Sequence, residues 1–236
     1  MKKLLEKIKN KFAKHSEWWI NYLTEMSVVV ISLGTTYYGN SLINDYMEKQ
    51  EDRKVVLMIR QELVTNLKEM EDIDQYCLKE IKFSETLVNK LIRKKRISSD
   101  SIKNFHNQHR LYYYWFLKNN AFDMLRESKV MQRVDKMLLM KLFECYEQLG
   151  VVKDMGGRYR EERIKRLAEF TTDQPEGLHA MTVTEQWKQI NRHKIFRQYL
   201  MITVPLMAKS TLAIERNTAL LVQKTIKEID QVYPPD

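Results

Sequence analysis

Residues that favour turns are rare before residue 150, and this scarcity limits what the chain can fold into. The first of its four prolines is Pro175, and only two of its six glycines, Gly34 and Gly39, precede Gly150. A protein built of β-hairpins needs such residues at its tight turns. The 236-residue chain is therefore predicted to be all-α, with long helices.

Residues 20–44 form a long apolar stretch in which Glu25 is the only charged residue. A helix of this length, rising about 1.5 Å per residue, matches a bilayer hydrocarbon core of about 30 Å. Trp18 and Trp19 precede it and tyrosines lie near its end, as in the aromatic belts at membrane interfaces. The stretch predicts one uncleaved transmembrane helix. A cleaved signal peptide and a core helix of a soluble protein are the competing interpretations.

Residues 1–19 are basic and carry apolar residues at helical spacing. They predict an amphipathic segment on the bilayer surface, with Lys7 and Lys11 at the headgroups. This segment holds six lysines, whereas residues 42–61 hold four Lys or Arg. The excess favours an N-terminus on the cytoplasmic side of a bacterial cytoplasmic membrane, with the large domain outside the cytoplasm. The margin is small, so the side of the large domain stays open.

Small and polar residues recur on one face of the predicted span. Lipid does not favour such a face, so it predicts a contact with another helix or the wall of a watery lumen. With one span per chain, the partner is another copy of the chain, and a homo-oligomer is expected. An alternative is that Glu25 lies shallow and reaches the interface. The predicted interface or lumen residues are Glu25, Ser32, Thr36 and Gly39.

Residues 45–236 are predicted to form a helical domain. Apolar residues at a mean spacing near 3.6 predict that the span continues as a helix to Arg93, packed in a bundle. They are Val56, Ile59, Leu63, Leu67, Met70, Ile73, Cys77 and Ile81. Further helices are expected through 111–117 and over 121–127, 131–149, 158–170, 182–202 and 206–232. Loops are expected at the glycines of 150–157 and at 171–181.

Three short patterns carry a resemblance to a known family. They are Tyr22-Leu-Thr-Glu25 with the apolar run after it, Arg60-Gln-Glu-Leu63 with Asn66-Leu67, and Asn120-Ala-Phe-Asp-Met-Leu-Arg126. With them, residues 1–150 resemble an uncharacterised family of bacterial single-span membrane proteins. The resemblance implies a topology and no chemistry.

The chain is more loosely similar to the membrane accessory proteins of RNA-targeting CRISPR systems, which are helical, basic and described as divergent HEPN-like proteins. That similarity implies pore formation and a protein partner in bacterial defence. The HEPN ribonuclease signature needs an Arg followed by a His after four to six intervening residues. No Arg-x4–6-His occurs here, and Arg192 and His193 are adjacent.

The sequence contains no recognisable catalytic, metal-binding or cofactor-binding motif. The protein is therefore predicted not to be an enzyme and not to bind a cofactor. His106 and His109, three residues apart, are too few for a metal site. The aromatic run Tyr112–Phe116 favours core packing over base stacking. The expected function is a non-enzymatic oligomeric scaffold or pore. The alternative is a membrane-tethered RNA-binding or HEPN-like effector, which leaves nucleic acid an open partner.

Overall fold

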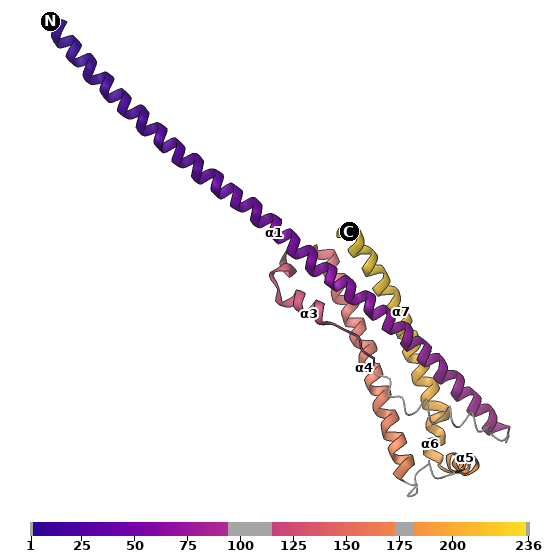
Figure 1. Cartoon of the computed structure of the whole chain (residues 1–236). Helices are drawn as coiled ribbons and strands as arrows, with labels where there is room; N and C mark the ends of the chain where they lie inside the picture. Colours follow the sequence, from indigo (N-terminus) through magenta and orange to yellow (C-terminus); the bar gives the residue numbers. More distant parts are fainter. Residues whose placement is uncertain (1, 94–114, 173–181, 235–236) are drawn as a thin grey trace. The chain divides into compact units, whose positions relative to one another are not determined.

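The computed structural model describes residues 2–93, 115–172 and 182–234, and every regular element among them is helical (Figure 1). The predicted all-α fold is thus confirmed. The elements are α1 (Lys2–Ile92), α3 (Asn120–Glu127), the 3-10 turn η1 (Lys129–Gln132), α4 (Lys136–Thr172), α5 (Val183–Arg192), α6 (Lys194–Gln198), the π-helix η2 (Tyr199–Thr203) and α7 (Val204–Val232).

The chain divides into two units, Met1–Arg53 and Lys54–Asp236, and α1 contributes to both. In the first unit α1 is the only element. Measured by length and mean hydropathy together, none of the described helices reaches the level of a membrane span. In the second unit α1 packs against α3, α4 and α7.

Ion pairs and hydrogen bonds fix the directions of the three long helices in the second unit. α7 runs antiparallel to α1, and Lys141–Glu228 joins α4 to α7. α1 and α4 are parallel, because Glu62 contacts Tyr146 whereas Glu80, further along α1, contacts Arg163, further along α4. The chain must therefore return along the bundle between them. The pairs joining α1 to α7 are Arg60–Asp230, Asp74–Arg216 and Glu85–Lys209.

Buried residues of α1 and α7 recur at alternating steps of three and four, which is the repeat of a coiled coil. This repeat differs from the predicted one because Asn66 and Glu80 are buried, whereas Leu67 and Ile81 are only half-buried. Hydropathy alone does not predict that Asn66 and Glu80 are buried, because both are polar. They are accommodated because each has a polar partner inside the bundle. The α1 seam is Val56, Ile59, Leu63, Asn66, Met70, Ile73, Cys77, Glu80, Ser84 and Leu87. The α7 seam is Val204, Ala208, Thr211, Glu215, Thr218, Val222, Thr225 and Ile229.

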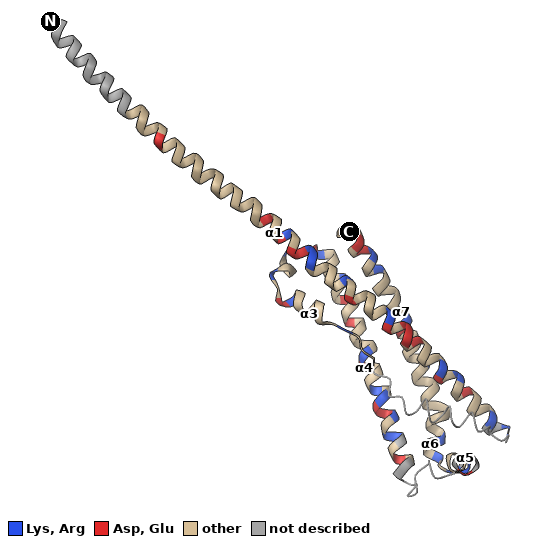
Figure 2. Ribbon diagram, in the orientation of Figure 1, with Lys and Arg blue, Asp and Glu red and all other residues tan. Residues whose placement is uncertain are grey.

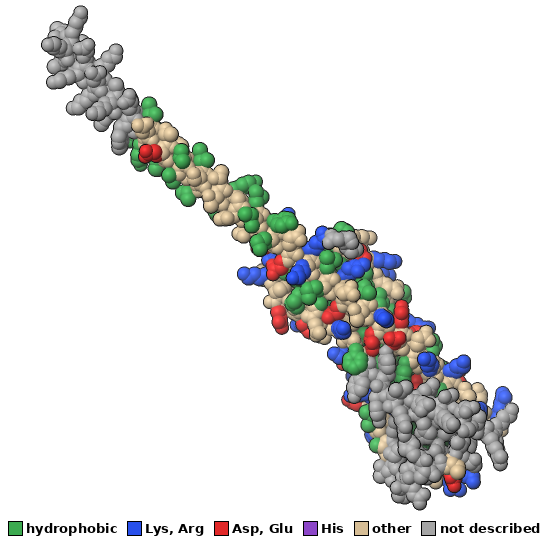
Figure 3. Space-filling view, in the orientation of Figure 1, with side chains coloured by type: hydrophobic (Ala, Val, Ile, Leu, Met, Phe, Trp, Pro, Cys, Tyr) green, Lys and Arg blue, Asp and Glu red, His purple; other side chains and the backbone are tan. Residues whose placement is uncertain are grey.

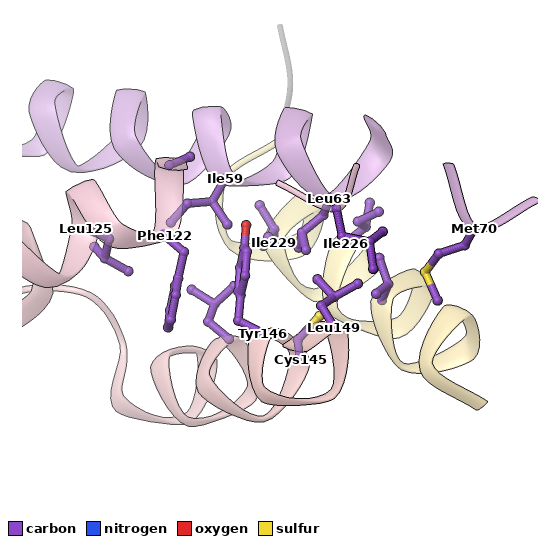
Figure 4. Packing of buried hydrophobic residues seen from close by; sticks show 14 of the residues in the cluster. Ile59, Leu63, Met70, Phe122, Leu125, Cys145, Tyr146, Leu149, Ile226 and Ile229 are labelled. Carbon is purple, nitrogen blue, oxygen red and sulfur yellow. The ribbon is translucent and has the colours of Figure 1, made fainter. Parts of the chain in front are cut away.

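Two separate apolar clusters fill the interior. The larger lies among α1, α3, α4 and α7, where Ile59, Tyr146 and Ile229 meet (Figure 4). The smaller joins the end of α1 to α4, α5, α6, η2 and the start of α7. In it Phe170 and Phe196 are stacked, with ring centroids 4.2 Å apart.

The segment before α3 corrects one prediction. A helix was expected through residues 111–117, but residues 115–119 are not helical, and 111–114 lie outside the described residues. Side chains of α1 bind the backbone of this segment, so its polar groups need no helical hydrogen bonds. The predicted helix at 121–127 is confirmed by α3.

α4 corrects a second prediction, because it continues through Gly150, Gly156 and Gly157 where a loop was expected. Buried residues recur on both sides of the glycines, and their packing offsets the low helix propensity of Gly. Gly156 has a specific role, since the indole of Trp115 lies against its Cα. A Cβ there would fall 2.0 Å from Trp115 Cε3, whereas nothing lies within 4 Å of one at Gly157.

Alanine at these neighbouring glycines should have opposite effects on stability. Gly156→Ala forces the Trp115 ring to move and is expected to lower the unfolding free energy by about 1–3 kcal/mol. Gly157→Ala gains helix propensity without a clash and should raise it by about 0.5–1 kcal/mol. Thermal unfolding followed by circular dichroism checks both. Equal shifts of the same sign would show that Trp115 does not occupy this site.

The C-terminal region is more broken than predicted. In place of one helix over 182–202, α5 begins with a capping box between Thr182 and Glu185, and the chain turns at His193 before α6. His193 caps α6, since its Nδ1 accepts a hydrogen bond from Phe196 N at 3.1 Å. The break expected at Pro205 takes the form of the π-helix η2, which leads into α7 with Pro205 in its first turn.

Pro205 also explains a buried hydrogen bond. In a π-helix the carbonyl of Leu200 would accept from the residue five positions on, which is Pro205 and has no N–H. Ser84 on α1 donates its hydroxyl to this carbonyl instead, at 2.5 Å. A seam position on α1 is therefore polar because a proline elsewhere leaves a carbonyl without its helical partner.

Candidate functional site

The predicted interface residues all lie on α1 in the first unit, and they share one face of that helix. At about 100° per residue, Glu25, Ser32, Thr36 and Gly39 fall within a narrow sector, whereas Gly34 lies on the opposite side. The sequence-based stripe is therefore continuous on one helix. Gly39 is half-buried, and the other three side chains are exposed.

Large apolar side chains are exposed between Trp19 and Met47, and at about 100° per residue they lie on every side of this helix. Figure 3 shows those on one face. Val30 is 62% exposed and Tyr37 is 82% exposed. Figure 2 shows that the same stretch carries little charge. A helix that is apolar around its circumference is stable only when something else covers it, such as lipid or other helices.

The hydroxyl groups of this stretch bond to the backbone of their own helix. Thr24, Ser27 and Thr36 donate to the carbonyls four residues earlier, at 2.8, 2.6 and 2.8 Å. Thr35 donates to the carbonyls of Ile31 and Ser32. A hydroxyl whose hydrogen bond is made locally costs less to remove from water.

The predicted membrane-interface residues are only partly described. Lys7, Lys11 and Trp18 lie within α1, but their side chains are outside the described residues. Trp19 is 52% exposed and meets Tyr22 edge to face, with ring centroids 6.1 Å apart. The structure thus places an aromatic pair at the start of the apolar stretch.

A polar ladder on α1 was not predicted from the sequence. Glu62, Asn66 and Glu69 are spaced four and three apart on one face, and each binds the backbone of the segment leading into α3. Asn66 forms two 2.8 Å hydrogen bonds with the backbone of Lys118. Glu69 accepts from Phe116 N at 3.1 Å.

Glu62 is the buried end of this ladder and has two partners. It accepts from Ala121 N at 3.0 Å, in the first turn of α3, and from Tyr146 Oη on α4 at 2.7 Å. Phe122 stacks on the ring of Tyr146 at 4.2 Å. Two of the sequence patterns singled out above, one on α1 and one on α3, therefore meet in space. Their contact holds the return segment to the bundle.

A second polar group lies between the two apolar clusters. Glu80 and Arg163 are 1% and 4% exposed, and Arg163 Nη2 is 3.5 Å from Glu80 Oε1. Tyr159 Oη donates to the other oxygen of Glu80 at 3.1 Å. The guanidinium of Arg163 also lies 5.8 Å from the centre of the Tyr76 ring. We call Glu80, Tyr159, Arg163 and Tyr199 the polar layer.

Burial dominates the electrostatics of the polar layer. It raises the pKa of Glu80 to about 7, with the Tyr159 hydrogen bond acting in the opposite direction. It lowers the pKa of Arg163 and raises that of Tyr199 well above its usual range. On α7, burial also raises the pKa of Glu215 to about 7. Perturbed groups can mark functional sites, but structural ion pairs perturb pKa values as well.

Neither the cysteines nor the histidines form a reactive centre in the described part of the chain. Burial raises the pKa of Cys77 and of Cys145 to about 12, which suits packing and not nucleophilic attack. No cluster of three metal-ligating side chains occurs among the described residues. His106, His109 and the tyrosines of the aromatic run lie outside them.

Comparison with known proteins identifies no relative. No protein-family model, curated protein or solved structure matches this chain.

Proposed function

We propose that this chain is a single-pass membrane protein that self-associates through residues 20–44 into a non-enzymatic oligomeric scaffold or pore. The observation that carries the proposal is the apolar circumference of α1 between Trp19 and Met47. Fully exposed, this surface would be unfavourable by roughly 25 cal/mol for each Å² of apolar area. This apolar surface would be removed from water if lipid covered most sides of the helix and neighbouring helices covered one side.

The residues that dilute the apolar character of this stretch support the same proposal. They are mainly Ser, Thr, Tyr and Asn, and the stretch carries one charge, Glu25. Four of its hydroxyl side chains are already bonded to their own helix. Small and hydroxyl residues are also those that let two helices approach closely within a membrane.

The proposed assembly places the stripe of Glu25, Ser32, Thr36 and Gly39 between copies of the chain or around a central lumen. Its setting would be a bacterial cytoplasmic membrane, with an accessory role in defence as the proposed context. A lumen lined by hydroxyls and carboxylates would let ions or small solutes cross the membrane without any chemical reaction.

Two glycine substitutions test the assembly. A Cβ at either Gly34 or Gly39 meets nothing within 4 Å in the single chain, so we expect the fold to accept leucine at both. Gly39→Leu is expected to split the oligomer, because the bulk lies on the stripe. Gly34→Leu is the matched control on the opposite face and should leave it intact.

The measurement is the mass of the detergent-solubilised full-length protein, corrected for bound detergent. The unmodified protein should give one species of several subunits and resist alkaline extraction from membranes. A monomeric unmodified protein, or equal effects of the two leucines, would contradict assembly through the stripe. Release from membranes by alkali would contradict the span itself.

A further inference from the structure

Positive charge is concentrated at one end of the second unit. We define the basic end as residues 79–93, 158–172, 183–198 and 204–210, which surround the smaller apolar cluster. These ranges hold fourteen Lys or Arg and six Asp or Glu. The other charged residues that the structure describes in this unit lie in 54–78, 115–157 and 211–234, which hold thirteen Lys or Arg and fourteen Asp or Glu. Among the described residues, the excess positive charge of the unit therefore lies at the basic end.

The acidic residues of the basic end are mostly engaged within the protein. Glu85 pairs with Lys209 at 3.7 Å, and Arg166 binds both Glu162 and Glu169. Glu185 accepts hydrogen bonds from the backbone and hydroxyl of Thr182 in the capping box. Most of the carboxylates of the basic end are therefore already engaged.

The exposed cations are spread over several helices. Lys188, Arg192 and Lys194 follow one another on α5 and α6, and all three are exposed. Lys79 and Lys82 on α1 and Arg158 and Lys165 on α4 are exposed as well. In Figure 2 Lys and Arg mark the ends of α1 and α4 and the α5–α6 region. A single small anion contacts only two or three such groups, whereas a chain of phosphates can contact many.

We propose that the basic end binds the phosphodiester backbone of a nucleic acid. Lys188, Arg192 and Lys194 form its centre, and the cations of α1 and α4 extend it. Between Lys79 and Lys90, α1 alone presents charge over about 16 Å at 1.5 Å per residue. Such a surface binds by neutralising phosphates and releasing counterions, without reading bases. This inference goes beyond the proposed scaffold or pore and does not depend on it.

The test uses full-length protein in a non-ionic detergent and a fluorescein-labelled 20-nucleotide single-stranded RNA. Fluorescence anisotropy gives the dissociation constant at several KCl concentrations. Affinity should fall steeply with salt. The variant Lys188→Gln/Arg192→Gln/Lys194→Gln should bind at least about tenfold more weakly and reduce the slope of log K against log salt by about 2, since each lost phosphate contact removes about 0.7 for a single strand.

The control removes the same charge from the other end of the unit. Lys129, Lys136 and Lys227 are exposed there, and their triple Gln variant should stay within about twofold of the unmodified protein. If both triple variants weakened RNA binding equally, the affinity would depend on net charge alone, and the proposal would be overturned. Absent binding at 50 mM KCl, or protease protection in intact cells showing that the second unit faces away from the cytoplasm, would also overturn it. Failure of the glycine test above leaves this result unaffected.

Discussion

Replacing Arg163 with methionine is expected to destabilise the protein by about 3–5 kcal/mol at pH 8, because it leaves the Glu80 carboxylate buried without a cation. The effect should shrink towards pH 5. Burial raises the pKa of Glu80 from its ordinary 4.5 to about 7 in the folded protein. The folded state therefore holds a proton that the unfolded state releases, and stability contributed by Glu80 falls as pH rises from about 4.5 to 7. Without Arg163 the folded pKa is higher still, so the penalty continues to grow above pH 7.

Urea unfolding of the variant at pH 5 and pH 8 measures this difference. The double variant Glu80→Gln/Arg163→Met should recover most of the loss at pH 8, since the amide can still accept from Tyr159 and carries no charge. Arg166→Met is the matched control, because Arg166 is partly exposed and pairs with Glu162 and Glu169 of its own helix. It should cost under about 1 kcal/mol. A loss for Arg163→Met that is the same at both pH values would mean that Glu80 is not the group left unpaired.

Glu62→Ala should destabilise the protein by about 2–4 kcal/mol. The change leaves the Tyr146 hydroxyl and the Ala121 N–H without their acceptor, and each buried orphan costs about 1–3 kcal/mol. Amide hydrogen exchange should also speed up at Ala121, because its N–H would bond to nothing. Glu69→Ala is the control on the same ladder. Its partner, the Phe116 N–H, is exposed, so its loss should stay under about 1 kcal/mol. Equal losses for the two variants would show that the Glu62 contacts are not formed.

The predictable elements of this fold are those that depend on the pattern of residues close together in the sequence. The scarcity of Pro and Gly predicted long helices, and the end of α1 near Arg93 was predicted because nothing interrupts the helical pattern before the basic run that begins there. The break at Pro205 was also visible, although its π-helical form was not. These features depend on residues close together in the chain.

What the sequence did not reveal depends on contacts between distant residues. Asn66 and Glu80 are polar and appear unsuited to a core until Lys118, Tyr159 and Arg163 are placed around them. Gly156 resembles a loop residue until Trp115 lies against it. The helix expected through 111–117 was wrong at residues 115–117 for the same reason, since Asn66 and Glu69 supply the hydrogen bonds that a helix would have made. The stripe on the first unit was readable because a helical face needs only spacing.

The packing of α1 against α7 has a consequence for synthesis. α1 leaves the ribosome first, yet its seam is complete only when α7 has been made, and 140 residues separate Ile92 from Val232. At about 5–20 residues per second this takes roughly 7–30 s. Throughout that interval an apolar coiled-coil seam lies exposed on each nascent chain. Neighbouring chains on one polysome therefore have time to pair through α1, so the order of translation itself favours mispaired α1 helices unless a chaperone or a membrane keeps them apart.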